Sequence, residues 1–520
     1  MGRAPLVSIF VISLAPSAFL AWQGRDFPHL GSFHDDAIYM GTAKSLAIKN
    51  QYRIDSLPWT PAQTKYPPLY PFYLSIAWRL TTSMEQVLPI AMFLNWLWLP
   101  VWALGVYRFL RVNACGQKLA LALSCLLALH PEVQLAATRL MSDLMFAALV
   151  IWALALLSEE RSVVMIGLAY LTRSAALPLY AGVAVIQLWR RQWRQLGILI
   201  AGAALPVGGW AVWVAAHRYS AQSAVEKYYT DYLAYQWHVV PLSQIPTHMV
   251  QQLDPLVAAI SRSLLLNFGD SMGWLMLSRI VCAACVVGII RLLRRGQVAA
   301  YAAYALFSLL MMLVWYFPPD TRALLPLLPL LVLGLYVEVA HFVELLVRAA
   351  SKGGSDRVLA FGLGPLCALL PFGMVLNGYA NLTANGQAMF ATERRSQQGA
   401  MEAHRWIAAN TSTETQFFSV DDPLLHLYTH RKALRLPELG SVVQRSSSGE
   451  YRPTAETLAA MDRFNLSCLF ISTKHFDPDP RFPDAPLRFS IEGTGLEERY
   501  RSRTELVACR RAKELPEFSR

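Results

Sequence analysis

The chain has 520 residues, of which 55% are hydrophobic and only 16% are charged, and its formal net charge is +11. Soluble globular proteins carry about 25% charged residues, so this composition excludes an ordinary soluble fold for most of the chain. A nucleic-acid-binding role is also excluded, because the lysines and arginines lie in short clusters between apolar runs and form no basic stripe.

Apolar runs of spanning or near-spanning length continue to about residue 380, where the composition becomes that of a soluble protein. We therefore predict an α-helical polytopic membrane domain over residues 1–380, with about eleven transmembrane helices. A small α/β domain is predicted over residues 381–520. The predicted spans are 4–22, 86–108, 119–131, 133–157, 162–172, 174–189, 196–215, 273–291, 298–317, 323–346 and 358–379.

The short loops between these spans carry clusters of Arg and Lys that fall on one side when the spans are counted in order. They are Arg108, Arg111 and Lys118; Arg190, Arg191 and Arg194; Arg291, Arg294 and Arg295; and Arg348, Lys352 and Arg357. The positive-inside rule places this side, and with it the N-terminus, in the cytoplasm. Residues 23–85, residues 216–272 and the tail then face outward, where we expect chemistry or binding.

Two adjacent carboxylates, Asp35 and Asp36, follow the first span where an outer loop enters a candidate amphipathic helix. Aspartate is favoured at a helix N-cap and complements the helix dipole, so capping explains one or both of them. A carboxylate at the membrane edge is also suited to act as a general base, because low polarity moves its pKa toward the working range. Both roles stay open, and one aspartate can cap while the other catalyses. A second outer helix is predicted from the helical spacing of apolar residues over 69–80.

Charged residues also interrupt the apolar runs. Arg139 and Asp143 lie four residues apart in the predicted span 133–157, so we expect them to share a helix face. Each charged side chain would raise the free energy of membrane insertion by about 2.5–3.5 kcal/mol at the middle of a bilayer. Such residues line a functional cavity or form a structural ion pair, and the sequence leaves both open.

Three further cations lie on the predicted outer side, against the positive-inside trend. Arg173 and Arg322 fall at outward turns, and Lys65 lies in the first outer loop before Tyr66 and two prolines. A phosphate held at the outer face would explain them, because Arg binds phosphate in a bidentate fork. Contacts of unconnected side chains with lipid headgroups are the alternative.

The tail has the pattern of a small α/β unit. Helices are predicted over 393–409 and 454–464, and strands over 415–420, 467–472 and 505–510. Cys468 and Cys509 can pair if the tail is extracytoplasmic, which the sequence leaves open. Cys282 and Cys285 form a CxxC inside an apolar helix, for which helix packing is favoured over a redox or metal site.

Several stretches, in this order, resemble the C-type glycosyltransferases (GT-C), membrane enzymes that use polyprenyl-phosphate sugar donors. The chain is most similar to the bacterial relatives of protein O-mannosyltransferases and of lipid A aminoarabinose transferases. The stretches are Asp35 to Tyr39, Lys65 to Tyr70, Arg139 to Phe146, Arg322 to Pro329, and, in the tail, His404 to Asn410 and Leu427 to Arg431. The chain departs from the family pattern at Asp36, where Glu is frequent, and at Ile38, where Arg is frequent. It also has Tyr66 where some members place Lys directly before the prolines.

The resemblance implies a hexosyl- or pentosyltransferase of the bacterial inner membrane with a periplasmic tail. The sugar would pass, with inversion, from a polyprenyl-phosphate donor to a hydroxyl of a lipid, glycan or protein acceptor. The resemblance assigns Asp35 as the base, with Asp36 as the second catalytic candidate. The implied donor-phosphate ligands are Lys65, Arg139, Arg173 and Arg322, and further site candidates are Tyr39, Tyr66 and Asp143.

No cofactor is required by the resemblance and no metal site is predicted, although a divalent metal at Asp36 stays open. The sugar, the acceptor and the oligomeric state are not specified. The main alternative is a lipid-linked saccharide flippase, a transporter or a binding protein, which would need intramembrane charges too. Many transporters have repeated halves and a polar site near the bilayer midplane, and no internal repeat was found. An enzyme should instead hold Asp35 beside several cations at the outer face.

Overall fold

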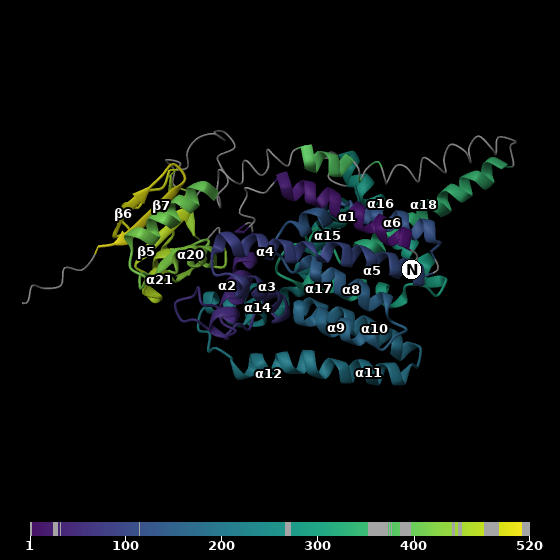
Figure 1. Ribbon diagram of the computed structural model, residues 1–520, viewed down its shortest axis with the longest axis horizontal. Helices are drawn as coiled ribbons and strands as arrows, with labels where there is room; N and C mark the ends of the chain where they lie inside the picture. Colours follow the sequence, from purple (N-terminus) through teal and green to yellow (C-terminus); the bar gives the residue numbers. More distant parts are fainter. Residues whose placement is uncertain are drawn as a thin grey trace, which may run out of the picture.

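The protein is a long helical body with a small sheet domain at one end (Figure 1). In the computed structural model, the described residues are 3–23, 30–31, 33–113, 115–265, 272–351, 373, 375, 377–384, 397–438, 442–445, 450–472 and 488–511. The sheet domain lies beside α2 (His34–Lys44) and α14 (Tyr232–Val239), and α18 (Leu328–Ser351) extends toward the opposite end (Figure 1).

The first half of the helical body contains two outer helices, α2 and α3, between longer apolar ones. Its helices are α1 (Arg3–Gln23), α2 (His34–Lys44) with a π-helical turn (Ser45–Lys49), α3 (Leu69–Leu80), α4 (Met84–Trp96), α5 (Trp98–Val112), α6 (Gln117–Ala128), α7 (Pro131–Ala137), α8 (Asp143–Ala155), α9 (Arg161–Thr172) and α10 (Leu177–Trp189). Helices are thus present at both positions where the sequence predicts outer helices, and their place on the outer side stays a prediction.

The second half adds α11 and α12, which continue one another, and a second group of outer helices. Its helices are α11 (Trp193–Ala203), α12 (Gly209–Ala216), α13 (Ala224–Thr230), α14 (Tyr232–Val239), α15 (Ile245–Leu265), α16 (Met272–Arg294), α17 (Ala299–Val314) and α18 (Leu328–Ser351).

Among the described residues, four helical stretches are long and apolar enough to cross a membrane: Met84–Val112, Trp193–Ala216, Leu275–Arg294 and Leu328–Leu346. A fifth is formed if α6 and α7, which bend by 60°, make one span. Shorter apolar helices cover Val7–Gln23, Asp143–Ala155, Arg161–Thr172, Ser174–Trp189 and Ala299–Val314. The chain is therefore an integral membrane protein, but the predicted number of spans is not confirmed. Most of the predicted span 358–379 lies outside the described residues.

The prediction of one continuous helix over 133–157 is wrong. The helix breaks between Ala137 and Asp143, where α7 ends and α8 begins. The buried amide of Asn95, on α4, donates hydrogen bonds to the carbonyl oxygens of Ala136 (3.2 Å) and Arg139 (2.8 Å) at the break. Irregular backbone at membrane depth is tolerated where other groups satisfy it, and Asn95 does so here.

Close contacts between helices explain the cysteines in α16. A Cβ atom on Gly288 would lie only 1.8 Å from the carbonyl oxygen of Gly334, so α16 and α18 cross backbone against backbone. On the same helix, the Cys285 thiol donates to the carbonyl of Leu331 (3.5 Å) and the Cys282 thiol to that of Val257 (3.7 Å). These contacts agree with the packing interpretation of the CxxC.

Three of the four loops with basic clusters contact neighbouring loops or helix starts. Arg108 pairs with Glu159, and Arg194 pairs with Glu160 at 3.0 Å. The loop after α5 also contacts the start of α17 through Asn113. The predicted grouping of these three loops on one side agrees with these contacts, whereas Lys352 and Arg357 of the fourth lie outside the described residues.

The described residues of the tail form a five-stranded mixed sheet in the order β2-β1-β5-β7-β6 and a separate two-stranded sheet of β3 and β4. Strand β1 is parallel to β2 and β5, and β7 is antiparallel to β5 and β6. A helix over residues 397–410 and the helices α20 and α21 accompany the sheet. The elements are β1 (Phe417–Ser419), α20 (Asp422–Thr429), β2 (Ala433–Leu434), β3 (Val443–Arg445) paired with β4 (Tyr451–Pro453), α21 (Ala455–Arg463), β5 (Cys468–Ser472), β6 (Leu496–Arg501) and β7 (Glu505–Arg510).

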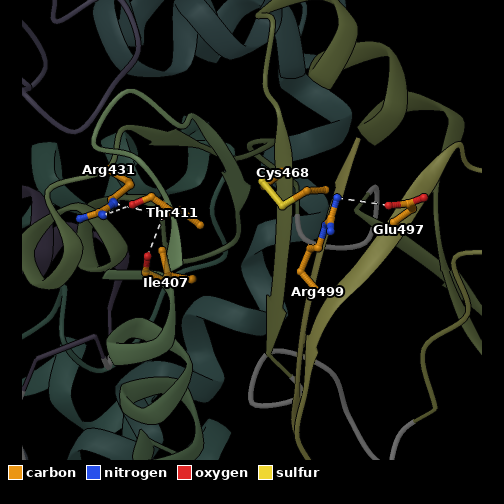
Figure 2. Close-up of a disulfide and its surroundings, with 7 residues drawn as sticks. Ile407, Thr411, Arg431, Cys468, Glu497 and Arg499 are labelled. Atoms are coloured by element: carbon orange, nitrogen blue, oxygen red, sulfur yellow. Dashed lines mark hydrogen bonds and ion pairs between the residues drawn. A yellow bond between two sulfur atoms is a disulfide. The ribbon is translucent and has the colours of Figure 1, made fainter. Parts of the chain in front are cut away.

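Cys468 and Cys509 lie opposite one another on β5 and β7 and form a disulfide (Figure 2). The pair that the sequence left open is therefore bonded in the structure. Elsewhere in the domain, the Arg431 guanidinium donates to Thr411 Oγ1 at 3.2 Å (Figure 2). It also donates to the Ala408 carbonyl at 2.9 Å. Disulfides persist in oxidising compartments, so this bond favours an extracytoplasmic location for the tail.

The tail and the outer loops share one hydrophobic core. Ile38 on α2, Ile54 in the first outer loop and Tyr229 on α13 are buried with Phe418 and Leu469 of the sheet. At the edge of the sheet, the amide of Ala433 donates to the carbonyl of Ser56 at 2.8 Å. The tail is therefore packed against the two segments for which the sequence predicts outer loops.

Candidate active site

Asp36 caps helix α2. Its carboxylate accepts hydrogen bonds from the backbone amides of Gly31 (3.0 Å) and Phe33 (3.0 Å) just before the helix begins. Burial raises the pKa of Asp36 to about 7, although the backbone donors oppose this shift. The capping role that the sequence left open for both aspartates is thus observed for Asp36.

Asp35 points away from the cap and accepts a hydrogen bond from the hydroxyl of Tyr66. Burial alone would raise the pKa of Asp35, but Lys65, the Tyr66 hydrogen bond, Arg322 and Arg173 together lower it below its usual value. A carboxylate in this setting is ionised at neutral pH. The expected rise of the base's pKa toward the working range is therefore wrong for Asp35, and the pKa that rises is that of Asp36. Asp35 is only partly buried, so a small polar group can approach it.

Lys65 is held in a box of three tyrosines, Tyr66, Tyr228 and Tyr232, which we call the tyrosine box. Its Nζ atom lies 3.7 Å from the ring centre of Tyr228, 4.4 Å from that of Tyr232 and 5.2 Å from that of Tyr66. Cation–π contacts of this kind orient an ammonium group without neutralising it. Lys65 is also buried, which does not favour a headgroup contact by a freely exposed side chain.

Two arginines stack on Phe33, the residue before α2. The guanidinium carbons of Arg322 and Arg139 lie 4.6 Å and 5.2 Å from its ring centre. Arg322 also lies 3.6 Å from Asp320, but its Nη1 atom is buried with no hydrogen-bond partner among the described residues. Buried donors normally have a partner, so this nitrogen is available to an incoming oxygen.

Asp143 pairs with Arg173, not with Arg139. The expected shared helix face of Arg139 and Asp143 is wrong, because the helix break separates them and Asp143 begins α8. Beside this pair, the hydroxyl of Tyr39 lies 3.2 Å from that of Ser142. The ring of Tyr39 is 4.8 Å from the ring of Tyr66, which connects the ion pair to Asp35.

The structure therefore gathers all of the predicted site residues around the N-terminal end of α2. Their roles remain predictions. Several neighbours were missed by the sequence analysis. His34 directly precedes the aspartate pair, and the tyrosines of α13 and α14 recur at close spacing, so both could have been noticed. Asp422 and Arg435 of the tail gave no comparable signal, because they are distant in sequence.

A groove of about 1130 Å³ lies next to the arginines. Apolar residues such as Pro131, Pro255 and Pro319 line it together with Glu132 and Arg262. Its lining continues to Thr321, the neighbour of Arg322. Within the described part of the chain, no group of three His, Cys, Asp or Glu residues is arranged to hold a metal ion.

Comparisons with known proteins agree with this architecture. A model described as Glycosyltransferase family 87 matches residues 64–315. The apo crystal structure of ArnT from Cupriavidus metallidurans superposes with a TM-score of 0.53 at 13% identity, covering 96% of this chain and 97% of ArnT. ArnT bound to undecaprenyl phosphate gives a TM-score of 0.52 at 13% identity and covers 98% of both chains.

The oligosaccharyltransferase AglB from Archaeoglobus fulgidus, in complex with an inhibitory peptide and a dolichol-phosphate, has a TM-score of 0.54 at 12% identity. This superposition covers 91% of this chain and 70% of AglB. No curated protein matches the sequence. At these identities the likeness concerns the fold, and it extends over the membrane domain and the tail together.

Proposed function

Because this chain has the fold of the C-type (GT-C) membrane glycosyltransferases, we propose that it transfers a sugar from a polyprenyl-phosphate donor to an acceptor hydroxyl. The observation that carries the proposal is the setting of Asp35. Its carboxylate is partly buried and ionised, and Lys65, Arg322 and Arg173 lower its pKa. A base for the acceptor and cations for the leaving phosphate are the two groups that such a transfer needs.

In the proposed reaction, Asp35 takes the proton of the acceptor hydroxyl while its oxygen attacks the anomeric carbon of the donor sugar. The bond from this carbon to the phosphate oxygen breaks, and polyprenyl phosphate leaves with the electron pair. Attack opposite the leaving group inverts the anomeric carbon. The Tyr66 hydroxyl keeps the Asp35 carboxylate in place, so that little reorganisation is needed.

The phosphate is proposed to bind the cations around the start of α2. Lys65 supplies a fixed ammonium in the tyrosine box, and Arg322 supplies its unpartnered Nη1 donor. Arg139 is adjacent through Phe33, whereas Arg173 acts mainly through its field because Asp143 already binds it. The polyprenyl chain would enter along the prolines of the groove beside Thr321, whose lining also contains charged residues.

We propose that the site faces the periplasm of a bacterial inner membrane. Two independent observations support this orientation. The basic loops gather at the end of the body where Arg108 pairs with Glu159, which the positive-inside rule assigns to the cytoplasm. The tail, which packs on α2, contains the disulfide of Cys468 and Cys509, and such bonds persist in oxidising compartments.

The test uses purified protein in lipid nanodiscs, radiolabelled polyprenyl-phosphate sugars and an envelope extract as the acceptor source. We expect label to leave the polyprenyl lipid with wild type and not with Asp35→Asn, while donor binding is retained. Asp55→Asn is a matched control, because Asp55 pairs with Lys49 at 2.9 Å and is not part of the candidate site. Transfer that survives in Asp35→Asn would exclude Asp35 as the base. Tight donor binding without transfer, in the presence of a proven acceptor, would favour the flippase or binding protein.

A further inference from the structure

The tail contacts the first residue of α2 through a buried acid–histidine pair. His34 Nε2 lies 2.7 Å from Asp422 Oδ1, at the start of α20. The Asp422 side chain is fully buried and that of His34 is 9% exposed. Burial raises the pKa of Asp422 and Arg435 opposes this shift. His34 directly precedes Asp35, so this contact fixes the helical turn that carries the proposed base.

A second contact path runs from the tail to the tyrosine box. Arg435, which follows β2, donates from Nη2 to the hydroxyl of Tyr228 at 3.3 Å. The same hydroxyl lies 3.3 Å from His34 Nδ1. Lys65 rests on the ring of Tyr228. A shift of this ring therefore moves the ammonium group that is proposed to hold the donor phosphate.

We propose that Asp422 and Arg435 of the tail are positioning residues for the transfer reaction, a role that rests on the proposed function. Asp422 sets the orientation of Asp35 through His34, and Arg435 sets that of Lys65 through Tyr228. Neither residue touches the donor or the acceptor. The tail is then part of the catalytic unit and does more than cover the site.

The two paths predict different kinetic effects. A displacement of about 1 Å at a reacting group lowers the rate about a hundredfold, so a disturbed Asp35 should lower kcat. A disturbed Lys65 should weaken donor binding instead. A tail that only docks onto the membrane domain would change both quantities little, or both together through loss of folded protein.

The experiment compares the full-length variants Asp422→Asn and Arg435→Gln with Arg463→Gln in nanodiscs. Arg463→Gln is the matched control, because it removes another ion pair between the tail and an outer loop, with Glu226 at 3.4 Å. We expect Asp422→Asn to lower kcat about tenfold to a hundredfold with donor Kd nearly unchanged. Arg435→Gln should raise the Kd for polyprenyl phosphate, and Arg463→Gln should leave both values near wild type.

A double variant, His34→Gln with Asp422→Asn, should be no worse than His34→Gln alone, because both substitutions break the His34–Asp422 contact and His34→Gln also removes the contact with Tyr228. Equal losses in all three tail variants, in parallel with lowered melting temperatures, would overturn the proposal. If wild type itself transfers no sugar, the proposed function fails separately. The positioning of Lys65 is then judged by polyprenyl phosphate binding, and it is wrong if Arg435→Gln binds like Arg463→Gln.

Discussion

The pH dependence of sugar transfer distinguishes the two adjacent aspartates. A general base must be ionised, so activity is lost as the pH falls through its pKa. The cations and Tyr66 lower the pKa of Asp35 below its usual 3.8, whereas burial raises that of Asp36 to about 7. With Asp35 as the base, kcat/KM should therefore stay nearly constant between pH 7.5 and pH 5.5.

If Asp36 were the base instead, the rate would depend strongly on pH over the same range. A base with a pKa of about 7 is roughly three-quarters ionised at pH 7.5 and about 3% ionised at pH 5.5. If Asp36 were the base, kcat/KM would fall about twenty-five-fold over this range. The donor is a phosphodiester, whose charge does not change over these pH values, so it adds no such effect.

The assay measures initial rates of label transfer in nanodiscs at subsaturating donor, for wild type and Asp36→Asn. Samples held at pH 5.5 are returned to pH 7.5, where full recovery of the rate excludes acid denaturation. Asp36→Asn should keep a flat profile, with a lower melting temperature because the α2 cap is weakened. An acid limb near pH 7 in wild type that disappears in Asp36→Asn would refute the assignment of Asp35.

Three further results are expected. Lys65→Met should raise the donor Kd about tenfold or more, since a hydrogen bond from a charged group contributes about 1.5–3 kcal/mol. Equilibrium binding of labelled polyprenyl phosphate measures this Kd, and an unchanged value would exclude Lys65 as a phosphate ligand. Asp143→Asn leaves Arg173 unpaired and should destabilise the protein by about 3 kcal/mol; the Tm should partly recover in the double variant with Arg173→Gln, and no recovery would contradict the pairing. Cys468→Ser opens a loop of 41 residues and should destabilise the tail by about 4 kcal/mol. Limited proteolysis in urea measures the stability of the tail, and a reductant should lower it in wild type but not in the variant.

Features coded by local patterns could be predicted from the sequence. The two outer helices have apolar residues at helical spacing and were located correctly as α2 and α3. In the tail, strands β1, β5 and β7 and helix α21 were also located, because short β-branched and apolar runs there are separated by turn residues. The membrane character followed directly from composition.

Features that depend on distant partners could not be predicted. The helix break before Asp143 is satisfied by Asn95, which lies 44 residues before Arg139 on another helix. The hydropathy of residues 133–157 does not depend on the side chain of Asn95, so the sequence predicted one continuous span there. For the same reason Asp143 was matched with Arg139, its neighbour in sequence, instead of Arg173.

The division of roles between Asp35 and Asp36 shows the same limit. Which carboxylate caps α2 depends on how the backbone of Gly31 and Phe33 turns before the helix. Both aspartates are equally good caps by residue type. Only the conformation of the preceding loop directs one carboxylate to the amides and leaves the other beside the hydroxyl of Tyr66.

The packing of the tail on α2 also has a consequence for biosynthesis. His34 and Asp422 are 388 residues apart, and a ribosome needs roughly 20–80 s to add that many residues. During this time the nascent protein already contains α2 but not its partner in the tail. In the proposed reaction the site is complete only after Asp422 has been synthesised and the tail has packed on α2, so an unfinished copy would consume little of the proposed donor lipid.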